Sequence, residues 1–121
     1  MRRQLLAAAL LACSCSVFTP ARVPGSGEGV IAFWMPGAAS VQVIGDWNEW
    51  GGLAGPSGLL DPRAGAMQCD GDGMWTAGLD LDRGRYRYAF LVDGHLWRDD
   101  PMNPVASTFD GHDVSLLVVT R

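Results

Sequence analysis

Lysine is absent from this sequence of 121 residues, and all nine basic residues are arginines, set against thirteen acidic residues. The formal net charge is −4, and the arginines form no basic stripe along the chain. Proteins that bind nucleic acid present a clustered basic surface. The composition therefore argues against a nucleic-acid partner.

Long hydrophobic runs and paired cysteines are also missing. The longest apolar run, "LLAAALLA" at residues 5–12, is far shorter than the roughly 20 residues that a membrane-spanning helix needs. Of three cysteines, only Cys69 lies beyond residue 15, so the sequence predicts neither an internal disulfide nor a metal site. Cys69 is expected to be a small buried residue.

The first residues have the pattern of an export signal. A basic start, Met1 to Arg3, precedes the apolar run, and "LLAC" at residues 10–13 resembles the lipobox of bacterial lipoproteins. The sequence predicts a signal peptide over residues 1–13 with lipidation of Cys13. Cys15, or ordinary cleavage a few residues later, remains an alternative. Ser14 after that cysteine, by the same resemblance, predicts the periplasmic face of the outer membrane, with membrane contact only through the anchor; otherwise the protein is secreted or periplasmic.

Residues 14–29 are rich in Pro, Gly and Ser and show no apolar period, which predicts a flexible tether. Residues 30–121 then form the folded domain. Without Arg2 and Arg3, the exported part has seven basic residues against thirteen acidic ones, a net charge of about −6. About 90 residues are enough for one sandwich with a single core.

Short alternating runs separated by turn residues fill the domain. "RYRYAFLV" at residues 85–92 places Tyr86, Tyr88, Phe90 and Val92 on one face of a strand. The turn signals include "DGDG" at residues 70–73. No helical period and no internal repeat is present. The sequence predicts an all-β fold, an immunoglobulin-like sandwich of six to eight antiparallel strands. The other expected strands are "VIAFWM" (30–35), "SVQVI" (40–44), "MQC" (67–69), "MWTAGLDL" (74–81), "HLWR" (95–98) and "VSLLVVT" (114–120).

Two segments of the domain carry a family resemblance. "FWMPGAASVQVIGDWNEW" (33–50) and "DGMWTAGLDLDRGRYRYAFLVDGHLWRDDP" (72–101) resemble the family-48 carbohydrate-binding module. This early-set domain precedes the catalytic barrel of glycogen branching enzymes and isoamylases, and forms the glycogen-binding domain of the AMP-activated protein kinase β subunit. The resemblance covers residues 31–119. It implies a non-catalytic module that binds an α-glucan and needs no cofactor.

Aromatic residues are the expected contacts with that ligand. An indole can cover the C–H face of a pyranose ring, while nearby polar groups bind its hydroxyls. Trp50 and Trp97 match the positions that stack on glucose in the kinase-subunit domain, so they are expected to face outward as sugar platforms. Arg87 and His112 are the expected hydrogen-bonding partners. Trp47 is expected to pack inward and to close the loop onto the sandwich.

The other singled-out residues have structural interpretations. Trp75 is expected in the core, and Trp34 in the core or half-buried. Asp93, Asp99 and Asp100 are interpreted as turn and fold residues rather than as catalytic carboxylates. Asp46 and Asn48 are expected to hydrogen-bond the loop backbone.

The polar positions depart from the family pattern. Ala89 stands where the kinase-subunit domain has a lysine, its threonine and asparagine positions fall near His112 and Val114, and its loop leucine falls at Phe109 or Asp110. Two alternatives therefore stay open. The sandwich is an interaction domain of the cell envelope, with a protein partner and no sugar binding, or it is an accessory piece of a glycoside hydrolase family 13 system with a separately encoded barrel.

Overall fold

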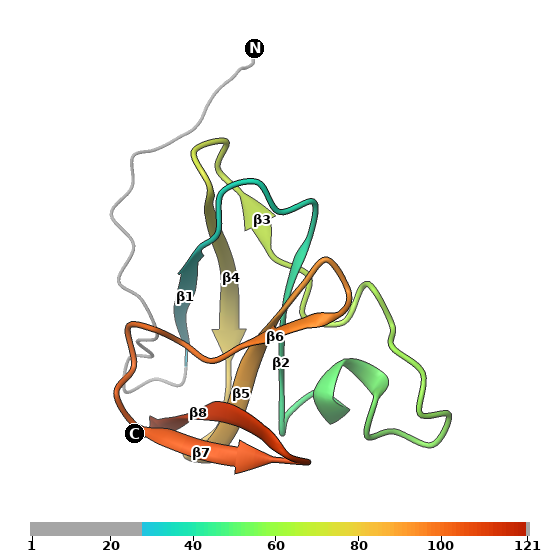
Figure 1. The fold of residues 1–121 in the computed structure, drawn as a ribbon. Helices are drawn as coiled ribbons and strands as arrows, with labels where there is room; N and C mark the ends of the chain where they lie inside the picture. Colours follow the sequence, from blue (N-terminus) through green and yellow to red (C-terminus); the bar gives the residue numbers. More distant parts are fainter. Residues whose placement is uncertain (1–27, 121) are drawn as a thin grey trace.

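The computed structural model describes residues 28–120, which form two antiparallel sheets packed as a sandwich (Figure 1). The smaller sheet has the order β1–β4–β3, and the larger has the order β2–β5–β8–β7 with β6 paired to β5. This confirms the predicted β-sandwich. The strands are β1 (Glu28–Trp34), β2 (Val41–Gly45), β3 (Gln68–Cys69), β4 (Met74–Asp80), β5 (Gly84–Val92), β6 (Leu96–Arg98), β7 (Ala106–Phe109) and β8 (His112–Val119), with a 3-10 turn, η1, at Glu49–Gly52.

The expected signal peptide, the lipobox at Cys13 and nearly all of the expected tether lie outside the described residues. Strand β1 begins at Glu28, two residues before the expected start of the domain at residue 30. Within residues 28–120, no helix is long and apolar enough to cross a membrane.

The main core lies between the two sheets. Strand β5 contributes Tyr88, Phe90 and Val92 to it, as the alternation predicted, and Tyr86 packs against its edge. The rings of Phe33 and Phe90 stack across the sandwich with centroids 4.2 Å apart. Trp75 is also in this core, which confirms its expected place. Its indole N–H donates to the carbonyl of Met35 at 3.0 Å.

A second, smaller core covers the opposite face of the larger sheet. It consists of Ile44, Trp50, Ala89, Leu91 and Val114. The later half of β5 is therefore buried on both sides, since its inward and outward residues each contact a core. This second core requires other segments to lie over the outer face of the sheet, and those segments hold the candidate site.

A buried polar network fixes the loop after β6. Burial raises the pKa of Asp100, and the nearby Asp99 adds to the effect, while hydrogen bonds from Tyr88 and Met102 oppose it. The Tyr88 hydroxyl donates to Asp100 Oδ2 at 2.7 Å, and the Met102 N–H donates to Asp100 Oδ1 at 2.9 Å. The Asn103 amide donates to the Tyr88 hydroxyl at 3.1 Å. Asp100 is therefore a structural residue, as predicted.

The turn at Asp93 also has its predicted structural role. Asp93 has a φ of 54° and Gly94 a φ of 78°, so both lie in the left-handed region that a tight hairpin turn requires. Asp93 Oδ1 accepts the backbone N–H groups of Ala39 at 2.7 Å and Ser40 at 3.1 Å. The turn between β5 and β6 is thereby joined to the segment that leads into β2.

Two burial expectations are wrong. Trp34 was expected in the core or half-buried, but 55% of it is exposed. Ile31 and Phe33 point into the core, so alternation along β1 directs Trp34 to the opposite face. Cys69 was expected to be buried and is exposed, because it ends the two-residue edge strand β3.

Candidate functional site

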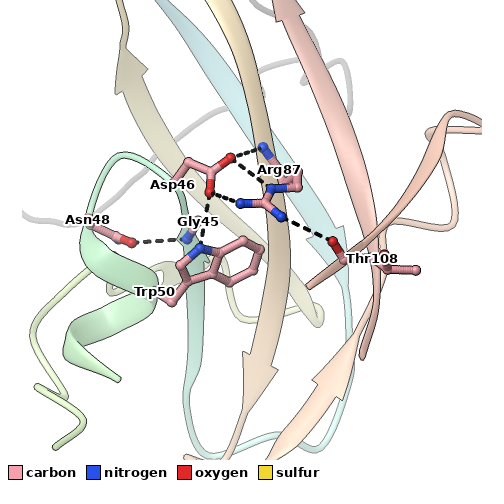
Figure 2. A network of polar contacts seen from close by, with 6 residues as sticks. All are labelled: Gly45, Asp46, Asn48, Trp50, Arg87 and Thr108. Carbon is pink, nitrogen blue, oxygen red and sulfur yellow. Dashed lines mark hydrogen bonds and ion pairs between the residues drawn. The ribbon is translucent and has the colours of Figure 1, made fainter. Parts of the chain in front are cut away.

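The "GDWNEW" loop after β2 is held by the side chain of Asn48. Asn48 Oδ1 accepts the N–H groups of Gly45 at 3.0 Å and Gly51 at 3.2 Å (Figure 2 draws the first). Its amide nitrogen donates to the carbonyl of Val43 at 3.1 Å. One side chain thus joins the end of β2 to the 3-10 turn, which confirms the expected role of Asn48.

Asp46 has different partners from those expected. Its carboxylate accepts the backbone N–H of Arg87 at 2.8 Å and the guanidinium of Arg87 at 3.1 and 3.2 Å, and also the indole N–H of Trp50 at 3.2 Å (Figure 2). The expectation that it bonds the loop backbone is wrong. Burial acts to raise the pKa of Asp46, but the hydrogen bonds from Arg87 and Trp50 outweigh it and hold that pKa below its usual range.

Trp50 is buried, with 2% of its surface exposed, so the expectation that it faces outward is wrong. Glu49 and Trp50 both have left-handed backbones, with φ of 56° and 55°. This conformation turns the chain back over the sheet and carries the indole onto the second core. The approach is close: a Cβ added to Gly51 would lie 2.8 Å from Ile44 Cγ2.

Four rings from three parts of the chain form one group, which we call the aromatic cluster: Trp50, Trp97, Phe109 and His112. Phe109 stacks on Trp50 with centroids 4.0 Å apart and planes 5° from parallel. His112 stacks on Trp97 at 3.8 Å and 7°, and the two tryptophans lie 5.9 Å apart. Phe109 and His112 are also a cross-strand pair of the β7–β8 hairpin. The end of this hairpin therefore covers both tryptophans.

The solvent-facing part of the cluster differs from the part expected. Trp97, Phe109 and His112 are half-buried, so their rings keep some contact with solvent. Arg87 lies beside them, with its guanidinium carbon 5.2 Å from the centroid of Phe109 and 40% of its side chain exposed. The structure thus brings the four sequence-predicted residues together, with Trp50 beneath the others.

Phe109 is the member that the sequence did not single out. Neither Phe109 nor the strand β7 that carries it was predicted, because "ASTF" shows no clear alternation of apolar residues. The available signal was its position, since the family's loop leucine falls at residue 109 or 110. Trp47, in contrast, packs against the main core, as predicted, and meets Tyr86 edge-on at 6.1 Å.

This arrangement suits a neutral ligand with flat apolar faces and hydroxyl groups. Half-exposed rings supply stacking surfaces, and the guanidinium supplies N–H donors. Residues 28–120 contain no group of three or more His, Cys, Asp or Glu side chains that could hold a metal ion. The chemistry that this site offers is recognition by contact and hydrogen bonding.

Comparisons with known proteins agree with this geometry. Residues 30–121 match the family model described as the glycogen recognition site of AMP-activated protein kinase. The chain is 32% identical over 91 residues to the chloroplastic protein FLOURY ENDOSPERM 6 of Oryza sativa subsp. japonica, covering 75% of this chain and 15% of that protein. It is 40% identical over 83 residues to the 1,4-alpha-glucan branching enzyme GlgB of Albidiferax ferrireducens, covering 67% of this chain and 12% of the enzyme.

The chain therefore spans less than a sixth of the length of each of these two relatives. The family match extends over nearly all of the described sandwich, including both tryptophans of the aromatic cluster. The chain belongs to the family of glycogen-recognition domains found in AMP-activated protein kinase and related to the N-terminal domain of glycogen branching enzymes.

Proposed function

We propose that this domain is a non-catalytic module that binds α-glucan of the glycogen or starch type through the aromatic cluster. The observation that carries the proposal is the stack itself. Three half-buried rings, Trp97, Phe109 and His112, gather on one face beside a guanidinium, in a domain of the glycogen-recognition family. Neutral sugars need no basic surface, so the acidic composition is compatible with this ligand.

Each member of the site has a distinct part in this proposal. Trp97 presents its exposed surface to a glucose unit, and His112 fixes the orientation of its indole. Trp50 supports the rings from below. Arg87 directs three of its N–H groups to Asp46 and to the Thr108 carbonyl (Figure 2). Since a guanidinium has five N–H donors, two remain for sugar hydroxyls.

Substitution of Trp97 by alanine is expected to weaken binding to glycogen about tenfold, because one stacking platform is lost. Affinity electrophoresis through glycogen-containing gels measures the effect. Trp34→Ala is the matched control, since it removes a tryptophan that is 55% exposed on the other sheet. Circular dichroism checks that both variants are folded. Equal retardation of wild type and Trp97→Ala would remove Trp97 from the site.

A second candidate function rests on one observation. Ala89, at the position of the family's lysine, is fully buried and offers no hydrogen bond. A domain that lacks this donor could serve as a protein-interaction module of the cell envelope instead. Under this alternative, no glucan retards the folded wild-type protein, and cross-linking recovers a protein partner. The two candidates therefore give opposite results in the same gel assay.

We also propose that the protein is exported and anchored through Cys13, which lies outside the described residues. The support is the basic and apolar start followed by "LLAC". Mass spectrometry of the mature protein from a bacterial host is expected to show an N-terminal Cys13 carrying acyl chains. Cys13→Ala should abolish that mass and release the protein from the membrane fraction. A mature chain that begins after residue 15 without lipid would contradict the anchor.

A further inference from the structure

A cleft of about 580 Å³ is lined by residues of both sheets and by no member of the aromatic cluster. Its volume falls within the range of roughly 300–1,000 Å³ that is usual for small-molecule sites. Val43 of β2 lines it from the inner face of the larger sheet, whereas Ile44, the next residue, belongs to the second core under the aromatic cluster. Strand β2 therefore separates the cleft from that cluster.

Polar groups without partners surround this cleft. Trp47, Gln68 and Thr76 all line it. Among the hydrogen bonds of residues 28–120, none involves the indole N–H of Trp47, the amide of Gln68 or the hydroxyl of Thr76, although Trp47 and Thr76 are half-buried. Buried polar groups are normally paired, so the half-buried indole N–H of Trp47 and hydroxyl of Thr76, together with the exposed amide of Gln68, are available to hydrogen-bond a ligand's hydroxyls.

The backbone of β4 offers further hydrogen-bonding groups to the cleft. Strand β3 has two residues and pairs only with Trp75 and Thr76, so within the described part of the chain no strand pairs with residues 77–80 on that side. Ala77, Gly78 and Leu79 of this free edge line the cleft. Unpaired backbone N–H and C=O groups on a strand edge are strong hydrogen-bonding groups.

The other walls of the cleft favour a neutral, partly apolar ligand. Trp47 lines it together with the apolar residues Val43 and Leu79. The one charged lining residue, Arg63, is already paired with Asp61 at 3.4 Å. A pyranose presents this combination, with an apolar face and a rim of hydroxyls.

A peptide added as a strand fits this cleft less well. The free edge has four residues and spans about 13 Å. The segment that contains Arg63, Gly65 and Ala66 lines the same cleft, so a strand added along this edge would share the space with that segment. Such a short edge suits one or two sugar units better than a longer peptide strand.

We propose that this cleft is a second carbohydrate site, which binds the end of a neutral oligosaccharide with Trp47 as its aromatic wall and Gln68 and Thr76 as hydrogen-bonding groups. The ligand class rests on the proposed function. Two sites on opposite sides of β2 let one domain hold two glucan chains, or two parts of one chain, which raises the avidity for a polymer without new contacts at the first site.

Titration of the full-length, 15N-labelled protein with maltoheptaose tests the proposal, because each of the five tryptophans has its own indole N–H signal. The expected result is that the signals of Trp47 and Trp97 both shift. In Trp97→Ala the Trp47 signal should still titrate. In the double variant Gln68→Ala/Thr76→Val the Trp97 signal should titrate as in wild type, while the response of Trp47 weakens at least tenfold. Trp47 itself is kept, because it packs against the main core.

The outcomes separate this proposal from the proposed function. A shift of Trp97 with a constant Trp47 signal overturns the second site and supports the first. A shift of Trp47 without Trp97 supports the cleft and counts against the aromatic cluster. If the Trp47 signal does not shift with maltoheptaose but shifts with an extended peptide, the cleft binds a peptide as an added strand, and its assignment to sugar is overturned. Equal Trp47 titration in the double variant also overturns the assignment.

Discussion

Replacement of Trp50 by alanine is expected to destabilise the domain by about 3–5 kcal/mol, the usual cost of removing a large buried aromatic side chain. The substitution leaves a cavity over the second core and removes the ring on which Phe109 stacks at 4.0 Å. It also removes the indole N–H that Asp46 accepts. Since small domains are stable by only about 5–15 kcal/mol, much of the chain should then be unfolded at moderate temperature.

Urea unfolding followed by circular dichroism measures this loss. Trp50→Phe should cost less than Trp50→Ala, because an aromatic ring remains to stack and mainly the hydrogen bond to Asp46 is lost. Trp34→Ala is the matched control, and its free energy of unfolding should stay within about 0.5 kcal/mol of wild type, since surface substitutions are usually that mild. If Trp50→Ala and Trp34→Ala unfold at the same urea concentration, Trp50 is not buried in solution.

Replacement of Asp100 by alanine should cost about 2–4 kcal/mol. It leaves the Tyr88 hydroxyl proton without its acceptor in a buried region and the Met102 N–H without its acceptor in a part-buried one, and an unsatisfied buried group costs about 1–3 kcal/mol. Asp100→Asn should be milder, because it keeps one oxygen and the shape of the side chain. Thermal unfolding at several pH values is the measurement.

The sign of the pH effect follows from the raised pKa of Asp100. The folded protein holds this proton more tightly than the unfolded chain does, so the protonation of Asp100 stabilises the fold below about pH 3.8, the ordinary pKa of an aspartic acid, and this stabilisation is lost as pH rises through the folded pKa. Asp46 has the opposite effect. Folding lowers its pKa, so its ionised carboxylate stabilises the fold above about pH 3.8, and this stabilisation is lost as pH falls through the folded pKa. The cost of Asp100→Ala should therefore be greater in acid than at neutral pH. A cost that is smaller in acid would contradict the role of burial.

Local patterns in the sequence predicted the features that depend on neighbouring residues. The alternation in β5 and the Asp-Gly turns follow from residues within a few positions of one another, whereas the inward position of Trp47 was implied by the family resemblance. The burial of Trp50 does not follow from its neighbours in the sequence. It depends on the left-handed turn at Glu49 and on Phe109, which comes from a hairpin that the sequence did not reveal.

The two burial errors have different physical reasons. For Trp34 the strand alternation is sufficient to place it outward, because Ile31 and Phe33 already fill the inward positions, whereas the expectation of burial followed the family pattern. For Cys69 the residue type was the only guide. Its exposure depends on β3 being a two-residue edge strand, which is a property of the whole sheet and not of the local sequence.

The composition of the aromatic cluster has a consequence for how the protein folds. Its rings come from residues 50, 97, 109 and 112, so the cluster closes loops of about 60 residues. Contacts of such long sequence separation are slow to form. The turns and hairpins can assemble first, and the cluster is complete only when the final hairpin arrives. We therefore expect the proposed binding surface to be one of the last parts of the domain to form during folding.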